Sequence, residues 1–474
     1  MLPSFPETST RLAGGLHYLG LTEVSELIRS RKVSPVELTT AMLGRIDGVD
    51  PLLQAYVRVM ADSAMASARL AEQEIGAGQL RGPLHGVPIA IKDIFWTHGA
   101  PTAAGMAMRR EFVGAEDATV VRRLKDAGAV LLGKLTLTEG VYAEHRPPFN
   151  APRNPWNASF WSGASSSGSG VAVAGGLCFA ALASETGGSI KLPSAVNGVT
   201  GLKPTWGRVS RYGVFELAAS LDHVGTIARS AADAAVMLGA IAGADDRDPT
   251  ASRQPVPDYL QSLDHGVRGL RIGVDDAWAR NGVDSGTSYA LDGALATMKD
   301  LGATLHQVKI PDGKDMIWDW FGVCAVETAL AHEATYPARG SEYGPALAEL
   351  LKLGHSMTAL QHQRLLQRRD GFSRALDAVF DHVDLIAMPL LSFPAPTLER
   401  MAQIDDDLIA GLHRFTCPFN MSGHPGIVLP CGFTAQRTPI AFQFVGRRFA
   451  EELLLTAGHA FQSNSDWHRV HPAL

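Results

Sequence analysis

Cysteine is scarce in this sequence. Only 4 of the 474 residues are cysteine, they are widely spaced, and no two form a C-x-x-C pair. A disulfide framework or a zinc ribbon would need paired or closely spaced cysteines. The sequence begins MLPSFPETSTRLAGG, without a basic stretch followed by an apolar one, so a secretory signal is not expected. Reduced thiols and a cytoplasmic protein are the resulting expectations.

The chain also lacks an excess of positive charge and a long apolar segment. Its formal net charge is −6, and no basic stripe stands out. Nucleic-acid binding therefore has no electrostatic support. The longest apolar run, Val171–Ala183, has 13 residues, fewer than the roughly 20 that a membrane helix needs. We expect neither a nucleic-acid partner nor a membrane partner.

Three familiar catalytic motifs are absent. The serine-rich stretch reads G-A-S-S-S-G-S-G, which does not match the nucleophile elbow G-x-S-x-G. His332-Glu333 has no second histidine at zinc-site spacing, and the 16 histidines are scattered. No G-x-x-x-x-G-K-[ST] phosphate loop is present. We expect no metal, and a surface or core role for lone histidines such as His332 and His413.

What the sequence does contain is a pair of small-residue loops around an apolar run. The first loop runs from Ser162 to Gly170 and the second from Glu185 to Ser189, with Val171–Ala183 between them. Loops of this kind on a buried support expose hydroxyls and backbone N–H groups, as catalytic sites require. A flexible linker is the alternative, but the apolar run between the loops argues against it.

Short apolar segments alternate with amphipathic ones along the chain. The amphipathic segments predict helices, with Thr22 and Ser34 as N-caps of the first two. The apolar segments predict strands at 87–91, 130–133, 179–184, 271–274, 303–308, 385–388 and 426–429. This alternation favours an α/β fold with a parallel or mixed sheet. We expect one domain over residues 1–474, with an N-terminal helical layer over about residues 1–80.

Serine chemistry without histidine needs another base. A serine hydroxyl becomes a good nucleophile only when a base takes its proton. A neutral lysine can do this if burial lowers its pKa. Lys92 ends the apolar run of GVPIAIKD, where a solvated lysine is not expected. The alternative is that its side chain reaches water or pairs with Asp93.

Several separated motifs together resemble the amidase signature family. They are GVPIAIKD (86–93), the Ser/Gly loop, ETGGSIKLP (185–193) and GLKPTWGRVSRYG (201–213). The resemblance covers most of the chain. It implies an amidase signature fold, in which helices cover both faces of a large central mixed β-sheet.

The resemblance also implies an activity. Members of the family hydrolyse amide-type C–N bonds in amides and anilides, and in some cases in carbamates (urethanes), without a metal or organic cofactor. A small-molecule amide or carbamate substrate is therefore expected. We expect the protein to be a monomer or a homodimer.

The family resemblance assigns a Ser–cis-Ser–Lys triad to this chain. The family's nucleophile is the serine of T-G-G-S, here Ser189, and its bridging serine lies 24 residues earlier, at Ser165. The base is the lysine of G-V-P-x-x-x-K-D, here Lys92. A cis peptide bond is expected between Ala164 and Ser165. The oxyanion would be held by four backbone N–H groups, those of Thr186, Gly187, Gly188 and Ser189.

The sequence departs from the family pattern close to the nucleophile. The family commonly reads D-T-G-G-S-I-R, whereas this chain has Glu185 and Lys191. A lysine cannot make the two parallel hydrogen bonds that an arginine makes to a carboxylate. We therefore expect the contacts that support this loop to differ from those in the family.

Two other functions remain open. One is the glutaminase subunit of a tRNA-dependent amidotransferase, but that branch has an arginine in the region of Leu347–Gly354 and an acidic residue where this chain has His413-Arg414. The other is a non-catalytic scaffold, which the intact triad disfavours. The aromatic stretches Met316–Phe321 and Phe149–Trp161 are expected either to line a substrate pocket or to belong to the core.

Overall fold

One eleven-stranded sheet forms the centre of the protein. The computed structural model describes residues 15–474, so the first 14 residues of the predicted N-terminal layer lie outside it. The strands lie in the order β1-β3-β2-β4-β6-β5-β10-β11-β9-β7-β8. They are β1 Tyr56–Val59, β2 Pro88–Lys92, β3 Val130–Leu135, β4 Ala180–Glu185, β5 Thr200–Lys203, β6 His223–Ala228, β7 Arg271–Val274, β8 Thr304–Gln307, β9 Leu385–Pro389, β10 Gly426–Phe433 and β11 Pro439–Gly446.

The sheet is mixed, as predicted. Strand β2 pairs in parallel with both β3 and β4, and β7 pairs in parallel with β8 and β9. The strands between these two groups, from β4 to β9 in the sheet order, pair antiparallel.

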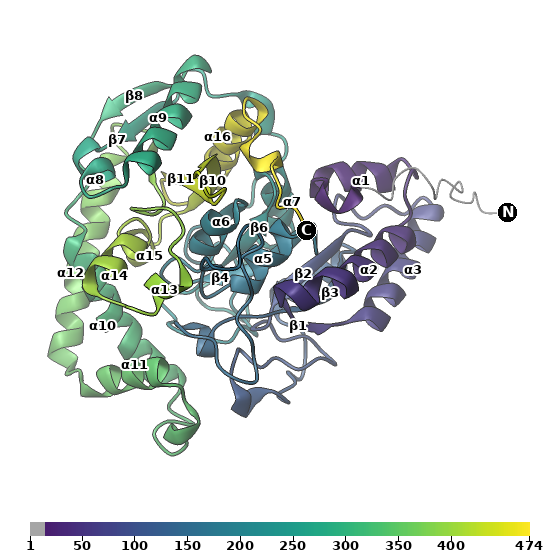
Figure 1. The fold of residues 1–474 in the computed structure, drawn as a ribbon, viewed down its shortest axis with the longest axis horizontal. Helices are drawn as coiled ribbons and strands as arrows, with labels where there is room; N and C mark the ends of the chain where they lie inside the picture. Colours follow the sequence, from purple (N-terminus) through teal and green to yellow (C-terminus); the bar gives the residue numbers. More distant parts are fainter. Residues whose placement is uncertain (1–14) are drawn as a thin grey trace.

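Helices surround this sheet (Figure 1). They are α1 Leu21–Arg29, α2 Pro35–Leu53, α3 Ala61–Gly76, α4 Thr119–Asp126, α5 Ser167–Ala174, α6 Lys191–Asn197, α7 Ala231–Ile241, α8 Asp276–Arg280, α9 Ser285–Asp300, α10 Lys314–Ala331, α11 Pro345–Ser356, α12 Ala359–Val379, α13 Leu398–Met401, α14 Asp406–His413, α15 Cys417–Met421 and α16 Glu451–Ser463. Within residues 15–474, no helix is long and apolar enough to cross a membrane.

Alternate residues of β10 show that helices cover both faces of the sheet. Val428 packs with residues of α6 in one apolar cluster, whereas Ile427 and Leu429 lie against Gly458 of α16. Successive side chains of a strand point to opposite faces. Helices α6 and α16 therefore lie on opposite sides of the sheet, as the family resemblance implied.

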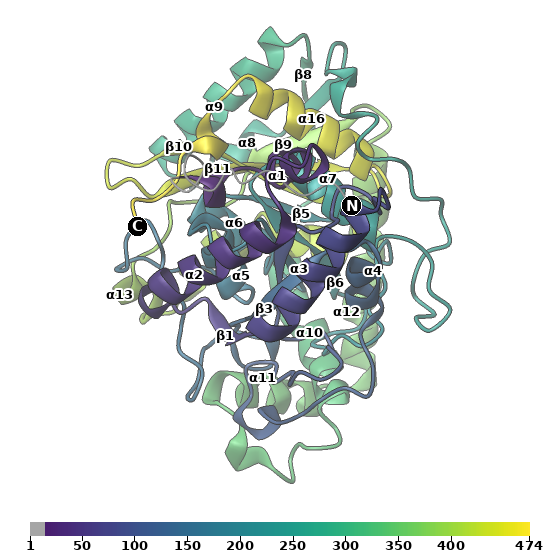
Figure 2. The same ribbon diagram turned by 90° about the vertical axis from the view of Figure 1, so that its right-hand side faces the viewer.

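The N-terminal helices α1, α2 and α3 lie together at one end of the molecule, and α10, α11 and α12 lie at the other (Figures 1 and 2). Ser34 caps α2 as predicted, accepting a hydrogen bond from the N–H of Glu37 at 3.0 Å. The predicted cap at Thr22 is wrong, because α1 already begins at Leu21. The N–H and hydroxyl of Thr22 instead donate to Asp233 of α7, at 2.9 and 3.0 Å.

Candidate active site

The parallel pairing of β2 and β4 brings Lys92 to the second small-residue loop. Ile91 of β2 lies opposite Leu182 of β4, so both strands end at the same edge of this part of the sheet. Lys92 is the last residue of β2, and Glu185 is the last of β4. Side chains at the carboxyl ends of neighbouring parallel strands meet in space. A lysine 93 positions upstream of Glu185 in the chain is thus held beside it in the fold.

The amine of Lys92 is fully buried and lies between two hydroxyls. Its Nζ is 2.8 Å from Ser165 Oγ and 2.9 Å from Ser184 Oγ. Burial lowers the pKa of Lys92 to about 7, while the carboxylates of Asp222 and Glu185 act to raise it. Asp93 does not pair with it; that carboxylate lies 3.2 Å from Lys134 Nζ. The alternative interpretation of Lys92 as a solvated or Asp93-paired residue is therefore wrong.

The loop that carries Ser165, just before α5, is fixed by contacts with β4 and α6. The peptide bond between Ala164 and Ser165 is cis, as predicted. Ser165 is fully buried, and Ser166 donates its hydroxyl hydrogen to the carbonyl of Ser184 at 3.0 Å. Asn197 of α6 donates to the carbonyl of Ser162 at 2.8 Å. The first small-residue loop is thereby attached to both β4 and α6.

Ser189 lies on the wall of a cavity of about 470 Å³. Ala164, the residue before Ser165, lines the same cavity. Unlike Lys92 and Ser165, Ser189 is partly exposed, and its side chain makes no hydrogen bond within residues 15–474. Its hydroxyl is therefore free to meet a ligand in the cavity.

The cavity wall is mainly apolar. Trp320 and Phe321 of α10 and Trp161 contribute aromatic surface, whereas Met316 and Ile317 of the same predicted stretches belong to the core. Among the described residues that line the cavity, none is a lysine or an arginine. The lining histidines His145 and His413 have pKa values lowered by burial, to about 4 for His145. At neutral pH this cavity therefore offers no cationic side chain to a ligand.

The loop that carries Ser189 is fixed by side chains from other elements. The carbonyl of Thr186 accepts from Trp320 Nε1 at 2.8 Å, and the carbonyl of Gly187 accepts from Thr416 Oγ1 at 2.7 Å. His413 Nδ1 lies 3.1 Å from that second carbonyl. The hydroxyl of Thr186 donates to Asp222 Oδ1 at 2.6 Å.

The four predicted oxyanion donors have no partner in the described chain. Across residues 15–474, no backbone or side-chain acceptor pairs with the N–H of Thr186, Gly187, Gly188 or Ser189. Thr186, Gly187 and Ser189 all line the cavity. Three of the four unpaired N–H groups therefore belong to residues at the cavity.

Glu185 and Lys191 form a different scaffold from the one an arginine would make. One carboxylate oxygen of Glu185 accepts from the N–H groups of Ile190 and Lys191, at 3.0 Å each. The other lies 3.4 Å from Lys191 Nζ, and both side chains are fully buried. Because lysine is not bidentate, the carboxylate is shared between one ammonium and the backbone at the start of α6.

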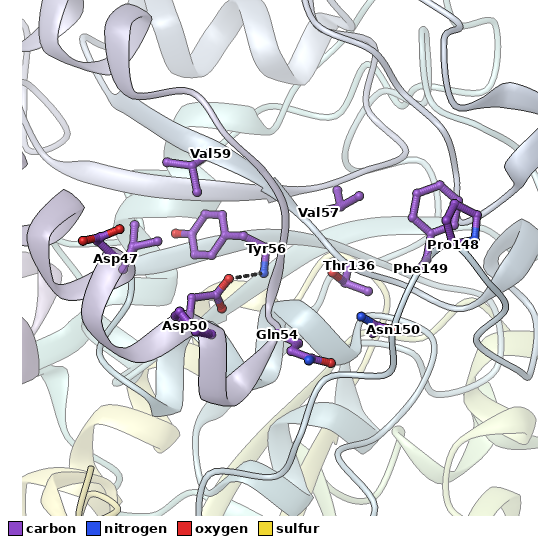
Figure 3. Close-up of a pocket in the computed structure, with 12 residues that line it drawn as sticks. Asp47, Asp50, Gln54, Tyr56, Val57, Val59, Thr136, Pro148, Phe149 and Asn150 are labelled. Carbon is purple, nitrogen blue, oxygen red and sulfur yellow. Dashed lines mark hydrogen bonds between the residues drawn. The ribbon is translucent and has the colours of Figure 1, made fainter.

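A second cavity, of about 430 Å³, lies beside α2 and β1 (Figure 3). It contains none of Lys92, Ser165 and Ser189. Its carboxylate Asp50 already accepts from the N–H groups of Ala55 and Tyr56, at 2.7 and 3.3 Å. A second carboxylate, Asp47, also lines this cavity, but no described lysine or serine does. Within the described residues, no cluster of three or more His, Cys, Asp or Glu side chains is arranged to hold a metal ion.

The structure thus brings Lys92 and Ser165 into contact and places Ser189 at the neighbouring cavity. It also adds Ser184, Asp222 and Thr416, which the sequence did not single out, and it brings Trp320 of the predicted aromatic stretch and His413 to the nucleophile loop. His332 is buried against Tyr343, in line with the expected surface or core role, whereas His413 is partly exposed and lines the cavity. The pair His413-Arg414, where the sequence departs from the amidotransferase branch, was the available signal.

Comparisons with known proteins match most of the chain to amidases and related proteins. The family model described as Amidase matches residues 37–455. AmiD of Mycobacterium tuberculosis, named as an amidase, is 49% identical over 457 residues, which is 96% of each chain. A glutamyl-tRNA(Gln) amidotransferase subunit of Chloroflexus aggregans is 36% identical, over 97% of this chain and 99% of its own. The structure of a bacterial aryl acylamidase of the amidase signature family matches with a TM-score of 0.85 at 27% identity, over 96% of this chain and 98% of its own.

Proposed function

Because this chain belongs to the amidase signature family, we propose that it hydrolyses neutral, apolar amides through an acyl-enzyme formed on Ser189. The observation that carries the proposal is the contact between buried Lys92 and Ser165, at 2.8 Å, beside a cavity lined by Ser189. A lysine whose pKa is about 7 is about half neutral at pH 7 and largely available as a base above it.

The first half of the reaction forms the acyl-enzyme. As Ser189 attacks the substrate carbonyl, its proton passes to Ser165, and the proton of Ser165 passes to the lone pair of Lys92. An N–H of Lys92 can meanwhile donate to Ser184, 2.9 Å away, which directs the lone pair toward Ser165. Collapse of the tetrahedral intermediate breaks the C–N bond, and the same relay returns the proton to the leaving nitrogen.

The second half releases the acyl group. Water attacks the ester carbonyl of the acyl-enzyme and gives a proton to the relay, and Ser189 leaves with that proton restored. In both halves the carbonyl oxygen becomes negative. The unpaired N–H groups of residues 186–189 support its stabilisation at this position, where one such donor contributes about 3–4 kcal/mol to transition-state binding.

The cavity favours an uncharged acyl or aryl group. Its aromatic wall of Trp161, Trp320 and Phe321 suits apolar contact. Anilides and alkyl amides fit this description, and a carbamate presents the same carbonyl beside a nitrogen. We therefore include carbamates as a second substrate class of the same site.

A glutaminase function is disfavoured by the same wall. Glutamine carries an α-carboxylate, and a protein usually binds this group with arginine. No described residue that lines the cavity is cationic. Arg414 does not serve, because its guanidinium donates to the carbonyls of Trp278 and Asn281.

The test is a substrate panel of alkyl amides, anilides, carbamates and glutamine, assayed with wild-type protein and with Ser189→Ala. We expect hydrolysis of apolar amides or anilides, a turnover with glutamine at least tenfold lower, and a loss of about 1000-fold or more in Ser189→Ala. Full activity of Ser189→Ala would refute the nucleophile. Efficient glutamine hydrolysis that increases with a partner protein would favour the amidotransferase function, and no hydrolysis at all would favour the scaffold.

We also propose that the chain is a single domain in a reducing compartment. One continuous sheet takes strands from Tyr56 through Gly446, which supports a single domain. All four cysteines are buried and unpaired, which supports cytoplasmic thiols.

A further inference from the structure

Side chains outside the triad hold two consecutive carbonyls of the nucleophile loop, and the Cys417 thiol, 3.5 Å from the carbonyl of Gly187, adds a weaker contact to those described next. Trp320 Nε1 donates to the carbonyl of Thr186 at 2.8 Å. Thr416 Oγ1 donates to the carbonyl of Gly187 at 2.7 Å, and His413 Nδ1 lies 3.1 Å from the same oxygen. We call Trp320, His413 and Thr416 the carbonyl clamp. They come from α10, from α14 and from the residue before α15.

The clamp determines where the next two N–H groups point. A trans peptide unit is planar, and its C=O and N–H point in opposite directions. The cis bonds in residues 15–474 are all elsewhere in the chain. Holding the carbonyl of Thr186 therefore directs the N–H of Gly187 away from Trp320. Holding the carbonyl of Gly187 likewise directs the N–H of Gly188 away from Thr416.

The two glycines allow the clamp to approach this closely. A Cβ at Gly187 would lie 2.6 Å from the indole ring of Trp320. A Cβ at Gly188 would lie 3.1 Å from Thr416 Oγ1, and the φ of Gly188 is +137°. Real Cβ atoms do not approach other atoms to 2.6 Å. The two glycines of T-G-G-S thus leave room for the contacts with Trp320 and Thr416 as well as for the approach of substrate.

His413 acts in the clamp as a neutral donor. Its Nδ1 must carry the hydrogen, because a carbonyl oxygen can only accept. Burial lowers the pKa of His413, although the Gly187 carbonyl acts to raise it. Its ring also stacks on Trp320, with 6.0 Å between centroids and 17° between planes. Two clamp members therefore fix each other as well as the loop.

We propose that Trp320, His413 and Thr416 are positioning residues that aim the N–H groups of Gly187 and Gly188 at the oxyanion. The clamp touches neither substrate nor the triad hydroxyls through these bonds; it acts through the peptide planes. This inference rests on the proposed amide hydrolysis at Ser189, and it assigns the orientation of the oxyanion site to residues that lie more than 100 positions from it in the sequence.

The test compares Thr416→Val, which keeps the shape and removes the hydroxyl, with Thr416→Ser, which keeps the hydroxyl. For an anilide substrate we expect Thr416→Val to lower kcat about 10- to 100-fold with KM nearly unchanged, because a donor displaced by an ångström costs up to about 100-fold. Thr416→Ser should recover most of that loss. The affinity of an aryl trifluoromethyl ketone, whose hemiketal oxyanion on Ser189 mimics the intermediate, should fall by the same factor as kcat/KM.

Thr456→Val is the matched control. Thr456 is a buried threonine of α16 that donates to the carbonyls of Ser262 and Glu452, at 3.0 Å each, and it does not line the cavity. It should lose a similar amount of thermal stability without a change in kcat. If Thr416→Val fails to fold, Trp320→Phe provides the second variant, since it removes the donor to Thr186 while keeping an aromatic ring.

The outcomes separate this inference from the proposed function. If wild type is active, Ser189→Ala is inactive and a folded Thr416→Val or Trp320→Phe has wild-type kcat and ketone affinity, the clamp is wrong and the proposed function stands. An equal loss in Thr456→Val would also contradict the clamp, because it would show a general stability effect. If Ser189→Ala remains active, the proposed function fails, and the clamp fails with it.

Discussion

The proposed role of Lys92 as a base depends on where its amine lies. An amine with an ordinary pKa of 10.5 is protonated at neutral pH and cannot accept a proton. Burial among strands of the sheet lowers this pKa to about 7. The rate of hydrolysis should therefore rise with pH through about 7 as Lys92 becomes neutral. Lys92→Ala should remove this step in the pH profile and nearly all activity.

We expect the charge of Asp222 to determine the pH at which the rate of hydrolysis rises. Its carboxylate stabilises the charged form of Lys92, so removing the charge lowers the pKa of Lys92 further. We predict that Asp222→Asn moves the acid limb of kcat/KM to lower pH, by on the order of one pH unit. Burial raises the pKa of Asp222 itself to about 6, so its charge is present over most of the range measured.

A pH–rate profile of kcat/KM from pH 5 to pH 9 measures this shift. Asp264→Asn is the control, because the side chain of Asp264 is 95% exposed and the change in charge is the same. Its profile should match that of wild type. An acid limb that moves to higher pH in Asp222→Asn, or does not move, contradicts the assigned coupling.

Only some site residues could be predicted from the sequence. Lys92, Ser165 and Ser189 lie in local motifs whose composition is unusual, so the motifs and the family resemblance single them out as candidates. Thr416, His413 and Trp320 act through hydrogen bonds to backbone carbonyls across more than 100 residues. Every residue has a backbone carbonyl, so the sequence does not indicate which side chain will donate a hydrogen bond to a given carbonyl. Such a donor can be identified only in the folded structure.

At the scale of secondary-structure elements, the turn from β4 into α6 matters most, because it carries Ser189. Glu185 ends the strand, and its carboxylate meets the first two backbone N–H groups of the region where α6 begins. The buried ion pair with Lys191 adds a charge on each side. Such a pair stabilises little in total, but removing one partner leaves the other uncompensated.

We predict that Glu185→Gln lowers the free energy of unfolding by about 3–5 kcal/mol. The amide oxygen can still accept from the backbone, but its NH₂ group then faces Lys191 Nζ. Adding Lys191→Met should restore part of this loss, so that the double variant is less destabilised than the two single changes summed. Urea unfolding of the four proteins measures the cycle. Additive effects would mean that the two side chains do not interact.

At the same scale, the strands that were predicted include both wholly apolar segments, such as VPIAI at 87–91, and partly polar ones, such as ATLHQV at 303–308. All seven predicted strands are present, as β2, β3, β4, β7, β8, β9 and β10. Strands β1, β5, β6 and β11 were not predicted. Polar residues or glycine interrupt each of these segments, as in YVRV and HVGTIA, but they also interrupt the predicted segments RIGV (271–274) and ATLHQV (303–308), so composition alone does not separate the two groups. Pairing with neighbouring strands stabilises such segments in the sheet even where their own composition does not favour a strand.

For the molecule as a whole, buried lysines make stability depend on pH. Lys203 of β5 is fully buried, and its Nζ donates to the carbonyl of Pro204 at 3.1 Å. Burial, and next the charge of Lys191, lowers its pKa from 10.5 to about 7. Between these two values the unfolded chain binds a proton that the folded protein does not. Stability from this group therefore increases as pH rises from about 7 to about 10.5.

We predict that Lys203→Met is stabilising relative to wild type near pH 7 and that its advantage shrinks as pH rises, by up to about 1.4 kcal/mol per pH unit. Urea unfolding at pH 7 and pH 9.5 measures the difference. Lys299→Met, an exposed lysine on α9, is the control and should show no such pH dependence. An advantage of Lys203→Met that grows with pH would contradict the direction of the pKa shift.

The cavity beside Ser189 is assembled from segments as distant as Val141 and His413. An unfolded chain has no such cavity, so a compound that binds there binds the folded state alone. At a free concentration 100 times its Kd, such a compound stabilises the fold by about 2.7 kcal/mol. Ser189→Ala protein, which we expect to be inactive, can therefore be used in a binding assay. The increase in melting temperature that each candidate amide or carbamate produces would rank these compounds as ligands before any turnover is detected.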